Sequence, residues 1–381
     1  MNFRETSERE ERIKKKREVL ERKRKQKITR FIMIILAAIL LIVVLILAIK
    51  GLVDKDSDKV SKKAKKSVEV QTTEVAEEEE TTEDPNAAPK DVDSYVDIAT
   101  DPELAAKIFG KHIAVIDVTD NTLIAGKSPD ERIYPASMTK VMTLIVAVEH
   151  IQSLDQTVVL EQEDIGHLYA EDASCAGFKV GEPITAKDLL YGLALPSGAD
   201  AAIGLAKMCA GSQEAFVQMM NDKCTELGLT NTHFANPTGL HDENLYTTAR
   251  EMAMIMRYAM RNETCKEVLS TYQYTAAAKN DYYPDGIVLV STLFSRIYGD
   301  REIPGVTIVA GKTGYTQEAM HCLVTYATSG GKEYVICDAG AEGTYWNTIW
   351  DNMRLYARFG AGYTGEGVVL SSGEVIVPPA E

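Results

Sequence analysis

Serine, lysine and threonine side chains occur in this chain at spacings that suit nucleophilic catalysis. Ser137 and Lys140 stand three residues apart at the start of a predicted helix, so both side chains lie on one face. A serine hydroxyl needs a base to become a nucleophile, and a lysine can serve when burial lowers the pKa of its amine. The helix is apolar almost throughout, so Lys140 would be a costly buried charge without such a role. This spacing predicts a nucleophile and its general base.

Two further stretches could complete such a site. Ser197 lies in a short polar step between two apolar predicted helices, in LALPSGADAA. Lys312 and Thr313 end an apolar predicted strand, in GKTGYT, where a lysine charge and a threonine hydroxyl suit a carboxylate. Gly314 would let a ligand's backbone approach closely. Taken singly, Ser197 also fits a helix junction and Lys312 a solubilising charge, so the prediction rests on all three stretches together.

The elements that would position these side chains indicate an α+β domain. Residues 112–128 read as two strands around a turn at Asp120-Asn121, and a buried helix is predicted from about Ser137 to Ile151. Helical patterns fill the middle of the chain, and strands return late, with a hairpin turn at residues 329–331. A final helix follows. We therefore expect one sheet that joins early and late strands, helices on both of its faces, and a helical subdomain between.

The charge of the chain is unevenly distributed, with a basic start and a net charge of -15. Residues 31–49 carry no charge or helix breaker and are long enough to cross a bilayer. The positive-inside rule then keeps the basic head in the cytoplasm, so no nucleic-acid partner is needed to explain it. We expect a single-pass cell-membrane protein with its catalytic domain outside. Its predicted parts are a basic cytoplasmic segment (1–30), a transmembrane anchor (31–50), a disordered charged linker (51–93), a catalytic domain (94–358) and a C-terminal tail (359–381).

The cysteines argue against a metal site. None of the six forms a CxxC pair, and no histidine lies at a zinc-ligand spacing from them. Their apolar surroundings favour buried free thiols. In an oxidising compartment two bridges would be open, Cys209–Cys224 and Cys322–Cys337.

Together the three stretches resemble, in order and spacing, the motifs of the penicillin-recognising serine enzymes. The chain resembles the low-molecular-mass penicillin-binding proteins, the serine-type D-Ala-D-Ala carboxypeptidases of peptidase family S11. The resemblance runs from about residue 94 to 358. It includes the segments YPASMTKVMT, AGFKVGEPITAKDLLYGLALPSGADAA, NTHFANPTGLHDENLYTTAREMA and GKTGYTQEAMHCLV.

This resemblance implies a role for each motif residue. Ser137 would be the acylated nucleophile, Lys140 its general base, and Ser197 a proton relay toward the leaving D-alanine. Lys312 and Thr313 would hold the terminal carboxylate of the peptide, beside Gly314. The backbone N–H groups of Ser137 and Tyr315 would form the oxyanion hole. The implied fold is β-lactamase/transpeptidase-like, with an antiparallel sheet flanked by helices and an all-helical subdomain. No metal or organic cofactor is implied.

Some positions depart from the family pattern or stand out on physical grounds. The second motif usually reads Ser-x-Asn, but Ala199 holds its third position and cannot hydrogen-bond the substrate or the catalytic lysine. Met320 replaces a small residue and could narrow the cleft. Arg250 lies in the first turn of a predicted helix, where a cation opposes the helix dipole, so we expect a fixed acidic partner and a structural role.

The function expected from the sequence is a tethered D,D-carboxypeptidase that trims terminal D-alanine from peptidoglycan stem peptides. Its partners would be those peptides, and β-lactams would be covalent inhibitors. A D,D-endopeptidase on cross-bridges is a second reading within the class. A β-lactamase is disfavoured because no E-x-x-L-N segment lies between Ser197 and Lys312. A wall-binding pseudoenzyme remains a reading from a different class.

Overall fold

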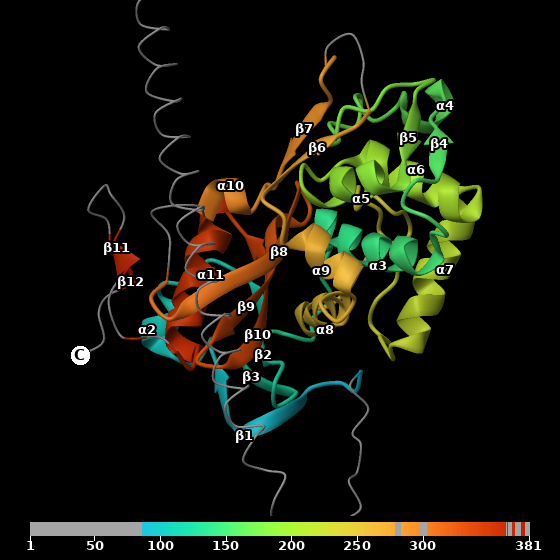
Figure 1. Cartoon of the computed structure of the whole chain (residues 1–381). Coiled ribbons are helices and arrows are strands. Elements are labelled where there is room, and N and C mark those ends of the chain that lie inside the picture. The colour runs from blue at the N-terminus through green and yellow to red at the C-terminus, as the bar shows by residue number, and fades with distance from the viewer. Residues whose placement is uncertain are drawn as a thin grey trace, which may run out of the picture. The chain divides into compact units, whose positions relative to one another are not determined.

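A mixed sheet lies at the centre of the structure, which is a computed structural model (Figure 1). It describes residues 86–278, 283–297, 303–362, 364, 368–369 and 375–377. Within these residues the central sheet has six strands in the order β1-β3-β2-β10-β9-β8. Its strands are β1 (Lys90–Asp97), β2 (His112–Asp117), β3 (Thr122–Lys127), β8 (Val306–Thr316), β9 (Met320–Ser329) and β10 (Lys332–Ala341).

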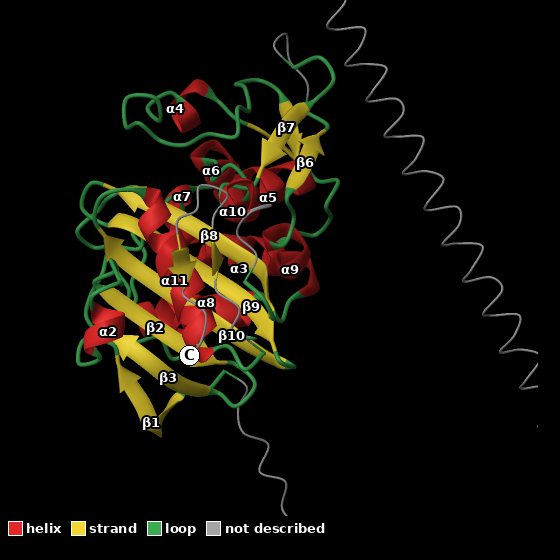
Figure 2. Cartoon of the chain, turned by 90° about the vertical axis from the view of Figure 1, so that its left-hand side faces the viewer, coloured by secondary structure: helices red, strands yellow, loops and turns green. Residues whose placement is uncertain are grey.

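Both faces of this sheet are covered, as the alternation of side chains along β2 requires. Ala114 and Ile116 point into one apolar core, whereas Ile113 and Val115 point into another. A strand places successive side chains on opposite faces, so a strand that is apolar at every position needs cover on both sides. Figure 2 shows helices on the two sides of the sheet.

The covering helices come from distant parts of the chain. Helix α8 packs on β10, β2 and β9, and α11 packs on β10 and β9 from the other side. The helices are α2 (Pro102–Ala105), α3 (Lys140–His150), α4 (Gln162–Ile165), α5 (Ala186–Ala194), α6 (Ala199–Ala210), α7 (Gln213–Glu226), α8 (Ala249–Ala259), α9 (Glu263–Leu269), α10 (Phe294–Ile297) and α11 (Tyr345–Phe359), with a 3₁₀ turn η1 (Ala136–Thr139).

A helical subdomain surrounds α3, which contacts α5, α6, α7 and α9. Helix α3 is buried along most of its length, so it has no polar face that could meet solvent. Small two-stranded sheets border this subdomain: β4 (Thr157–Val159) pairs with β5 (Pro183–Thr185), and β6 (Gln273–Ala276) pairs with β7 (Ile287–Val290). The start of α3 therefore lies where the subdomain meets the central sheet.

The α+β class and the helices on both faces are confirmed, but the sheet is not purely antiparallel. Strand β1 pairs with β3 in parallel, while the remaining neighbours are antiparallel. The expected linker also ends earlier than residue 93, because β1 begins at Lys90. Two arginines of α8 hold this segment in place. Arg250 donates to Asp91 at 2.8 Å, and Arg257 donates to the Ala87 carbonyl oxygen at 2.8 Å.

The predicted anchor, the cysteines and the C-terminal tail were also subjects of prediction. The predicted anchor lies outside the described residues. Among the helices that the structure does describe, none combines the length and apolar character needed to cross a membrane. All six cysteines are free thiols, so neither Cys209–Cys224 nor Cys322–Cys337 is bridged. In the tail, β11 (Val368–Val369) pairs with β12 (Val375–Val377).

The acidic partner predicted for Arg250 is present. Its guanidinium donates to both carboxylate oxygens of Asp130, at 2.6 and 2.8 Å, and also to Asp91. These hydrogen bonds raise the pKa of Arg250 above its ordinary value. Arg250 therefore joins α8, β1 and the loop after β3, which is the structural role expected from the sequence.

Candidate active site

Ser137 and Lys140 lie together at the start of the buried helix. Ser137 is in the 3₁₀ turn η1, and Lys140 is the first residue of α3. The Lys140 Nζ donates to the Ser137 Oγ at 2.9 Å. The sequence spacing predicted that these two side chains lie together. The 3₁₀ turn that carries Ser137 leads directly into α3, whose first residue is Lys140.

The environment of Lys140 favours its neutral form. The side chain is 3% exposed. Burial lowers the pKa of Lys140 to about 7, with Asp200 and Cys175 acting in the opposite direction. The Nζ also donates to the backbone carbonyl oxygen of Thr238. An amine that is about half neutral at pH 7 and directed at a serine hydroxyl can accept its proton.

Ser197 is paired with Lys312, from the opposite side of the site. Ser197 has a φ of 68°, in the left-handed region, at the junction between α5 and α6. Its Oγ accepts a hydrogen bond from the Lys312 Nζ at 2.8 Å, and the same amine donates to the Thr313 carbonyl oxygen at 2.9 Å. Strain of this kind at a non-glycine residue indicates a position that its neighbours hold in place.

Lys312 is buried among other cations. Burial lowers the pKa of Lys312 well below its ordinary value, and the positive charges of Lys140 and Arg296 lower it further. An arriving carboxylate would reverse this effect, because a nearby opposite charge favours the charged form of an amine. Binding of a carboxylate would therefore favour the charged form of Lys312.

The residues after Lys312 continue β8 beside the nucleophile. The Thr313 hydroxyl shares a hydrogen bond of 2.7 Å with the hydroxyl of Thr292, which precedes α10. At Gly314, an added Cβ would lie 3.1 Å from the backbone nitrogen of Ser137, so β8 passes directly beside the nucleophile. Tyr315 is exposed and its ring stacks on His321 at 4.5 Å between centroids. The two backbone segments assigned to the oxyanion hole thus lie side by side.

The loop 236–241, for which the sequence predicted no role, packs against the backbone that carries the nucleophile. Gly239, with φ of 80°, packs so closely that a Cβ there would lie 2.1 Å from the Ala136 carbonyl oxygen. The Asn236 side chain accepts from the backbone N–H groups of Thr238 and Gly239 and from the Thr238 hydroxyl. The Asn-Pro-Thr-Gly stretch in the sequence was the available signal, since such residues are typical of a tight turn.

Ala199 occupies an apolar setting and Asp200 a structural one. Ala199 is 1% exposed and belongs to a small apolar cluster with Leu168 and Ile203. Asp200 is buried and accepts backbone N–H groups of residues 176–178 and 201, which holds the loop before β5 against α6. Burial raises the pKa of Asp200. In the described residues the Lys140 amine is satisfied by Ser137 and Thr238, so its contacts do not depend on an amide at position 199.

The described part of the chain contains no cluster of three or more His, Cys, Asp or Glu side chains arranged to hold a metal ion. The two Ser–Lys pairs supply a nucleophile and candidate proton-transfer groups. A nucleophile, a base, a second hydroxyl and a carboxylate-binding strand suit acyl transfer from a peptide that ends in a free carboxylate.

The family model of the D-alanyl-D-alanine carboxypeptidases, peptidase S11, matches residues 97–341. This chain belongs to that family. Its family was predicted from the motifs, and the prediction is confirmed. The S11 relatives that carry this name are serine peptidases.

Three of the similar S11 proteins show how far the likeness extends. The D-alanyl-D-alanine carboxypeptidase DacF of Bacillus subtilis is 35% identical over 236 residues, which is 61% of this chain and 57% of that protein. The carboxypeptidase of Streptomyces strain K15 is 36% identical over 221 residues, 56% of this chain and 75% of that protein. The crystal structure of a D-alanyl-D-alanine carboxypeptidase from Mycobacterium tuberculosis matches with a TM-score of 0.58 and 29% identity, over 67% of this chain and 95% of that one.

A relative named for a second activity is also similar. The D-alanyl-D-alanine endopeptidase of Pseudomonas aeruginosa is 28% identical over 214 residues, 56% of this chain and 66% of that protein. This chain thus spans little more than half of the Bacillus relative and about two thirds of the Pseudomonas one.

Proposed function

We propose that this chain is a serine D,D-carboxypeptidase that removes the terminal D-alanine from peptidoglycan stem peptides. The observation that carries the proposal is the juxtaposition of two hydrogen-bonded pairs, Ser137 with Lys140 and Ser197 with Lys312. Membership of the S11 family supports the same reaction.

Acylation would begin at the Ser137 hydroxyl. Neutral Lys140 accepts the hydroxyl proton while Oγ attacks the carbonyl carbon of the penultimate D-alanine. The developing oxyanion accepts hydrogen bonds from the backbone N–H groups of Ser137 and Tyr315, a contribution of about 10²–10³ in rate per donor. The substrate's free carboxylate would bind Lys312 and Thr313.

The C–N bond then breaks, and the nitrogen of the leaving D-alanine must receive a proton. Lys140 holds the proton taken from Ser137, and the Ser197 hydroxyl would relay it to that nitrogen. An ester between Ser137 Oγ and the shortened peptide remains. Attack by water, with Lys140 again accepting a proton, would release the peptide and restore the serine.

Intact mass after incubation with a labelled penicillin tests this assignment. We expect one adduct on Ser137, no adduct in Ser137→Ala, and D-alanine release from a pentapeptide by the unmodified chain. The absence of both adduct and D-alanine release would overturn the proposal and favour a wall-binding pseudoenzyme.

The endopeptidase reading has support from the Pseudomonas relative. The two activities differ in whether the residue after the scissile bond carries a free α-carboxylate or belongs to a cross-bridge. Rates on a pentapeptide and on a purified cross-linked dimer separate them. We expect preference for the pentapeptide, because the buried Lys312 amine and the Thr313 hydroxyl suit a terminal carboxylate.

We propose further that residues 31–50 anchor the chain in the cell membrane, with the catalytic domain outside. The uninterrupted apolar run and the basic residues ahead of it support this topology. Protease treatment of intact spheroplasts should remove the domain and leave the basic head protected. Recovery of the full-length chain in the soluble fraction would contradict the anchor.

A further inference from the structure

Residues 291–293 join β7 to α10 and lie against β8. The Thr292 backbone N–H donates to the carbonyl oxygen of Leu195, the residue that caps the end of α5, at 2.9 Å. The Leu293 side chain packs so closely on β8 that a Cβ added at Gly311 would lie 2.4 Å from its Cδ2. This segment is therefore fixed between the end of α5 and the strand that carries the carboxylate-binding residues.

Two threonine hydroxyls meet where this segment reaches β8. The hydroxyl oxygens of Thr292 and Thr313 are 2.7 Å apart, and both side chains are half-buried. In the part of the chain that the structure describes, neither hydroxyl has another hydrogen-bond partner. A hydroxyl offers one proton and two lone pairs. The pair holds two protons but uses only one between its oxygens, so the other is available to a ligand.

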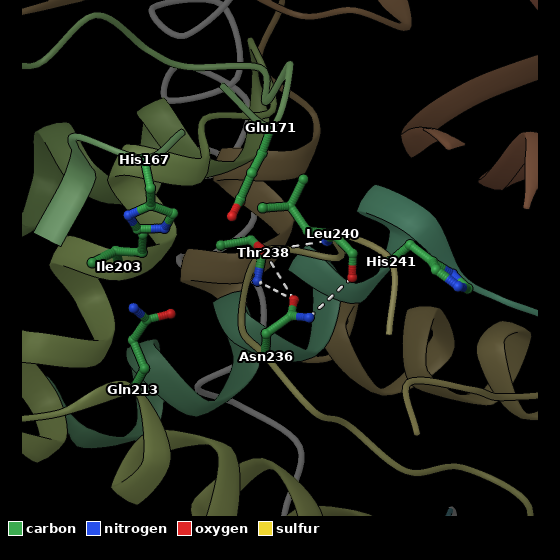
Figure 3. A pocket seen from close by; sticks show the side chains of 8 residues that line it. All are labelled: His167, Glu171, Ile203, Gln213, Asn236, Thr238, Leu240 and His241. Carbon is green, nitrogen blue, oxygen red and sulfur yellow. Dashed lines mark hydrogen bonds between the residues drawn. The ribbon is translucent and has the colours of Figure 1, made fainter. Parts of the chain in front are cut away.

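A third threonine near the nucleophile, Thr238, has no such spare proton. Its carbonyl oxygen accepts from the Lys140 amine, but its hydroxyl turns back into its own loop. The hydroxyl donates to the Asn236 Oδ1 at 2.9 Å, and its oxygen accepts from the Leu240 backbone N–H at 3.2 Å (Figure 3). The hydroxyl pair beside β8 therefore differs from this one in being able to donate to a substrate.

The direction of the hydrogen bond within the pair decides what it presents to a substrate. When Thr292 donates, the Thr313 proton stays free and can be given to a carboxylate oxygen. When Thr313 donates, its oxygen presents only a lone pair, which a carboxylate would repel. Hydrogen bonds in a chain polarise one another, so donation by Thr292 also makes the Thr313 hydroxyl a better donor. A bound carboxylate would therefore select the arrangement in which Thr292 is the donor.

We propose that Thr292 is a positioning residue for the Thr313 hydroxyl. By donating to the Thr313 oxygen it directs the Thr313 proton to the carboxylate at the end of the substrate, and it strengthens selection of that carboxylate over a neutral carboxamide. Hydrogen bonds to a charged acceptor are about twice as strong as neutral ones, so the carboxylate gains more from this arrangement. The assignment rests on the proposed carboxypeptidase function, and it adds a residue that lies outside the three sequence motifs.

Two acyl donors that differ only in their last group test this role. One is an N-acyl-D-alanyl thioester of thioglycolate, which ends in a carboxylate. The other is the thioester of thioglycolamide, which ends in a carboxamide. A thioester is a more reactive acyl donor than a peptide, so both should acylate Ser137 at a measurable rate, with the carboxylate preferred in the unmodified chain.

Thr292→Val keeps the shape of the side chain and removes its hydroxyl. We expect kcat/KM for the carboxylate donor to fall by about three- to tenfold, the size of one hydrogen bond. The carboxamide donor should be nearly unaffected, because its neutral end gains little from a polarised Thr313 hydroxyl. The ratio of the two kcat/KM values therefore reports the role of Thr292, whereas a structural defect would lower both values together.

Three further variants serve as controls. Thr292→Ser retains a hydroxyl and should restore the preference for the carboxylate. Thr292→Ala repeats the removal of the hydroxyl if circular dichroism shows that valine disturbs the fold. Ser295→Ala removes an exposed hydroxyl from α10, one that makes no hydrogen bond to Thr313, and should leave the ratio unchanged.

The outcomes that contradict this role are distinct from those that contradict the proposed function. Equal losses on both donors, an unchanged ratio in Thr292→Val, or no recovery in Thr292→Ser would overturn the role of Thr292. So would equal rates on the two donors in the unmodified chain. D-alanine release from the pentapeptide is measured separately, and its absence would overturn the proposed function whether or not the thioesters are discriminated.

Discussion

Lys140 determines the pH at which the site can begin its reaction. Because burial lowers the pKa of Lys140 to about 7, the neutral amine gains population as pH rises through that value. We expect the second-order rate constant of penicillin acylation to rise with pH and level off above a midpoint near 7. This constant reports ionisation in the free enzyme. Stopped-flow or mass-spectrometric acylation rates across pH would measure it.

Cys175 provides the control for that profile, since it is the other titratable group whose charge influences Lys140 besides Asp200. Burial raises the pKa of Cys175 above its ordinary value, so its thiol should stay protonated where Lys140 titrates. Cys175→Ser should therefore leave the midpoint where it is. A midpoint that moves with this substitution would mean that the Cys175 thiol ionises in the same pH range and contributes to the profile.

Ala199 lies in a buried apolar cluster that would not suit a larger polar side chain. Its methyl packs beside Leu168 and Ile203, so an asparagine amide there would be buried among apolar groups. We expect Ala199→Asn to lower the free energy of unfolding by about 1–3 kcal/mol. Urea denaturation measures this, with Ala199→Ser as a smaller polar change. Unaltered stability combined with faster acylation would show that the amide turns toward the catalytic residues instead.

At the scale of elements, the nucleophile is held between β8 and the loop 236–241. Gly314 passes beside Ser137 on one side, and Gly239 packs on Ala136 from another. Neither contact tolerates a side chain without movement of the backbone that carries Ser137. The position of the nucleophile therefore depends on two segments that are distant from it in sequence.

Gly239→Ala should disable the site far more than it unfolds the domain. The new Cβ would overlap the Ala136 carbonyl group and displace Ser137, and a displacement of about 1 Å can cost about a hundredfold in rate. We expect kcat/KM for pentapeptide to fall by about that factor while the circular dichroism spectrum is retained.

Gly211→Ala is the matched control for this substitution. Gly211 has a φ of 79°, nearly that of Gly239, but an added Cβ would meet nothing within 4 Å. It should lose about 1–2 kcal/mol of stability from the left-handed conformation and keep its activity. Similar kinetic losses in both variants would show that backbone strain, and not the contact with Ala136, controls the rate.

Sequence patterns predict contacts that local spacing determines. Ser137 and Lys140 meet through one helical turn, and the strand with Lys312 was evident from its apolar run. The contact between Gly239 and Ala136 was not predictable, because it depends on how a loop packs against a distant helix. The parallel pairing of β1 was missed for a similar reason: an acidic, weakly apolar segment is ordered by arginines of α8.

At the scale of the whole molecule, two buried carboxyl groups make stability depend on pH. Asp338 in β10 and Asp351 in α11 are both fully buried, and Asp351 raises the cost of ionising Asp338. The pKa of Asp351 is raised to about 6, chiefly by burial, although its Oδ2 accepts backbone N–H groups of Phe109 and Gly110 at 2.7 Å. The pKa of Asp338 is raised well above its ordinary value, also by burial.

Both carboxyl groups favour the folded state in their protonated forms. Folding raises both pKa values, so the protonated groups stabilise the fold fully below the unfolded value of about 3.9, and this stability is lost as pH rises through about 6. In Asp338→Asn the repulsion is removed, and we expect the unfolding free energy to vary less between about pH 5 and pH 8. Urea titrations at several pH values measure this. An unchanged slope would mean that other groups set the dependence.

The docking of β1 has a mechanical consequence. Within the described sheet, β1 and β8 form opposite edges, with four strands between them. A pull on the chain ahead of Asn86 would load β1 along its length and oppose its parallel pairing with β3 and the arginine contacts of α8. That load would reach β8 only after crossing the width of the sheet. We expect tension applied at the start of the domain to separate β1 from β3 before it disturbs the geometry around Ser137, so the site would keep its arrangement under that load.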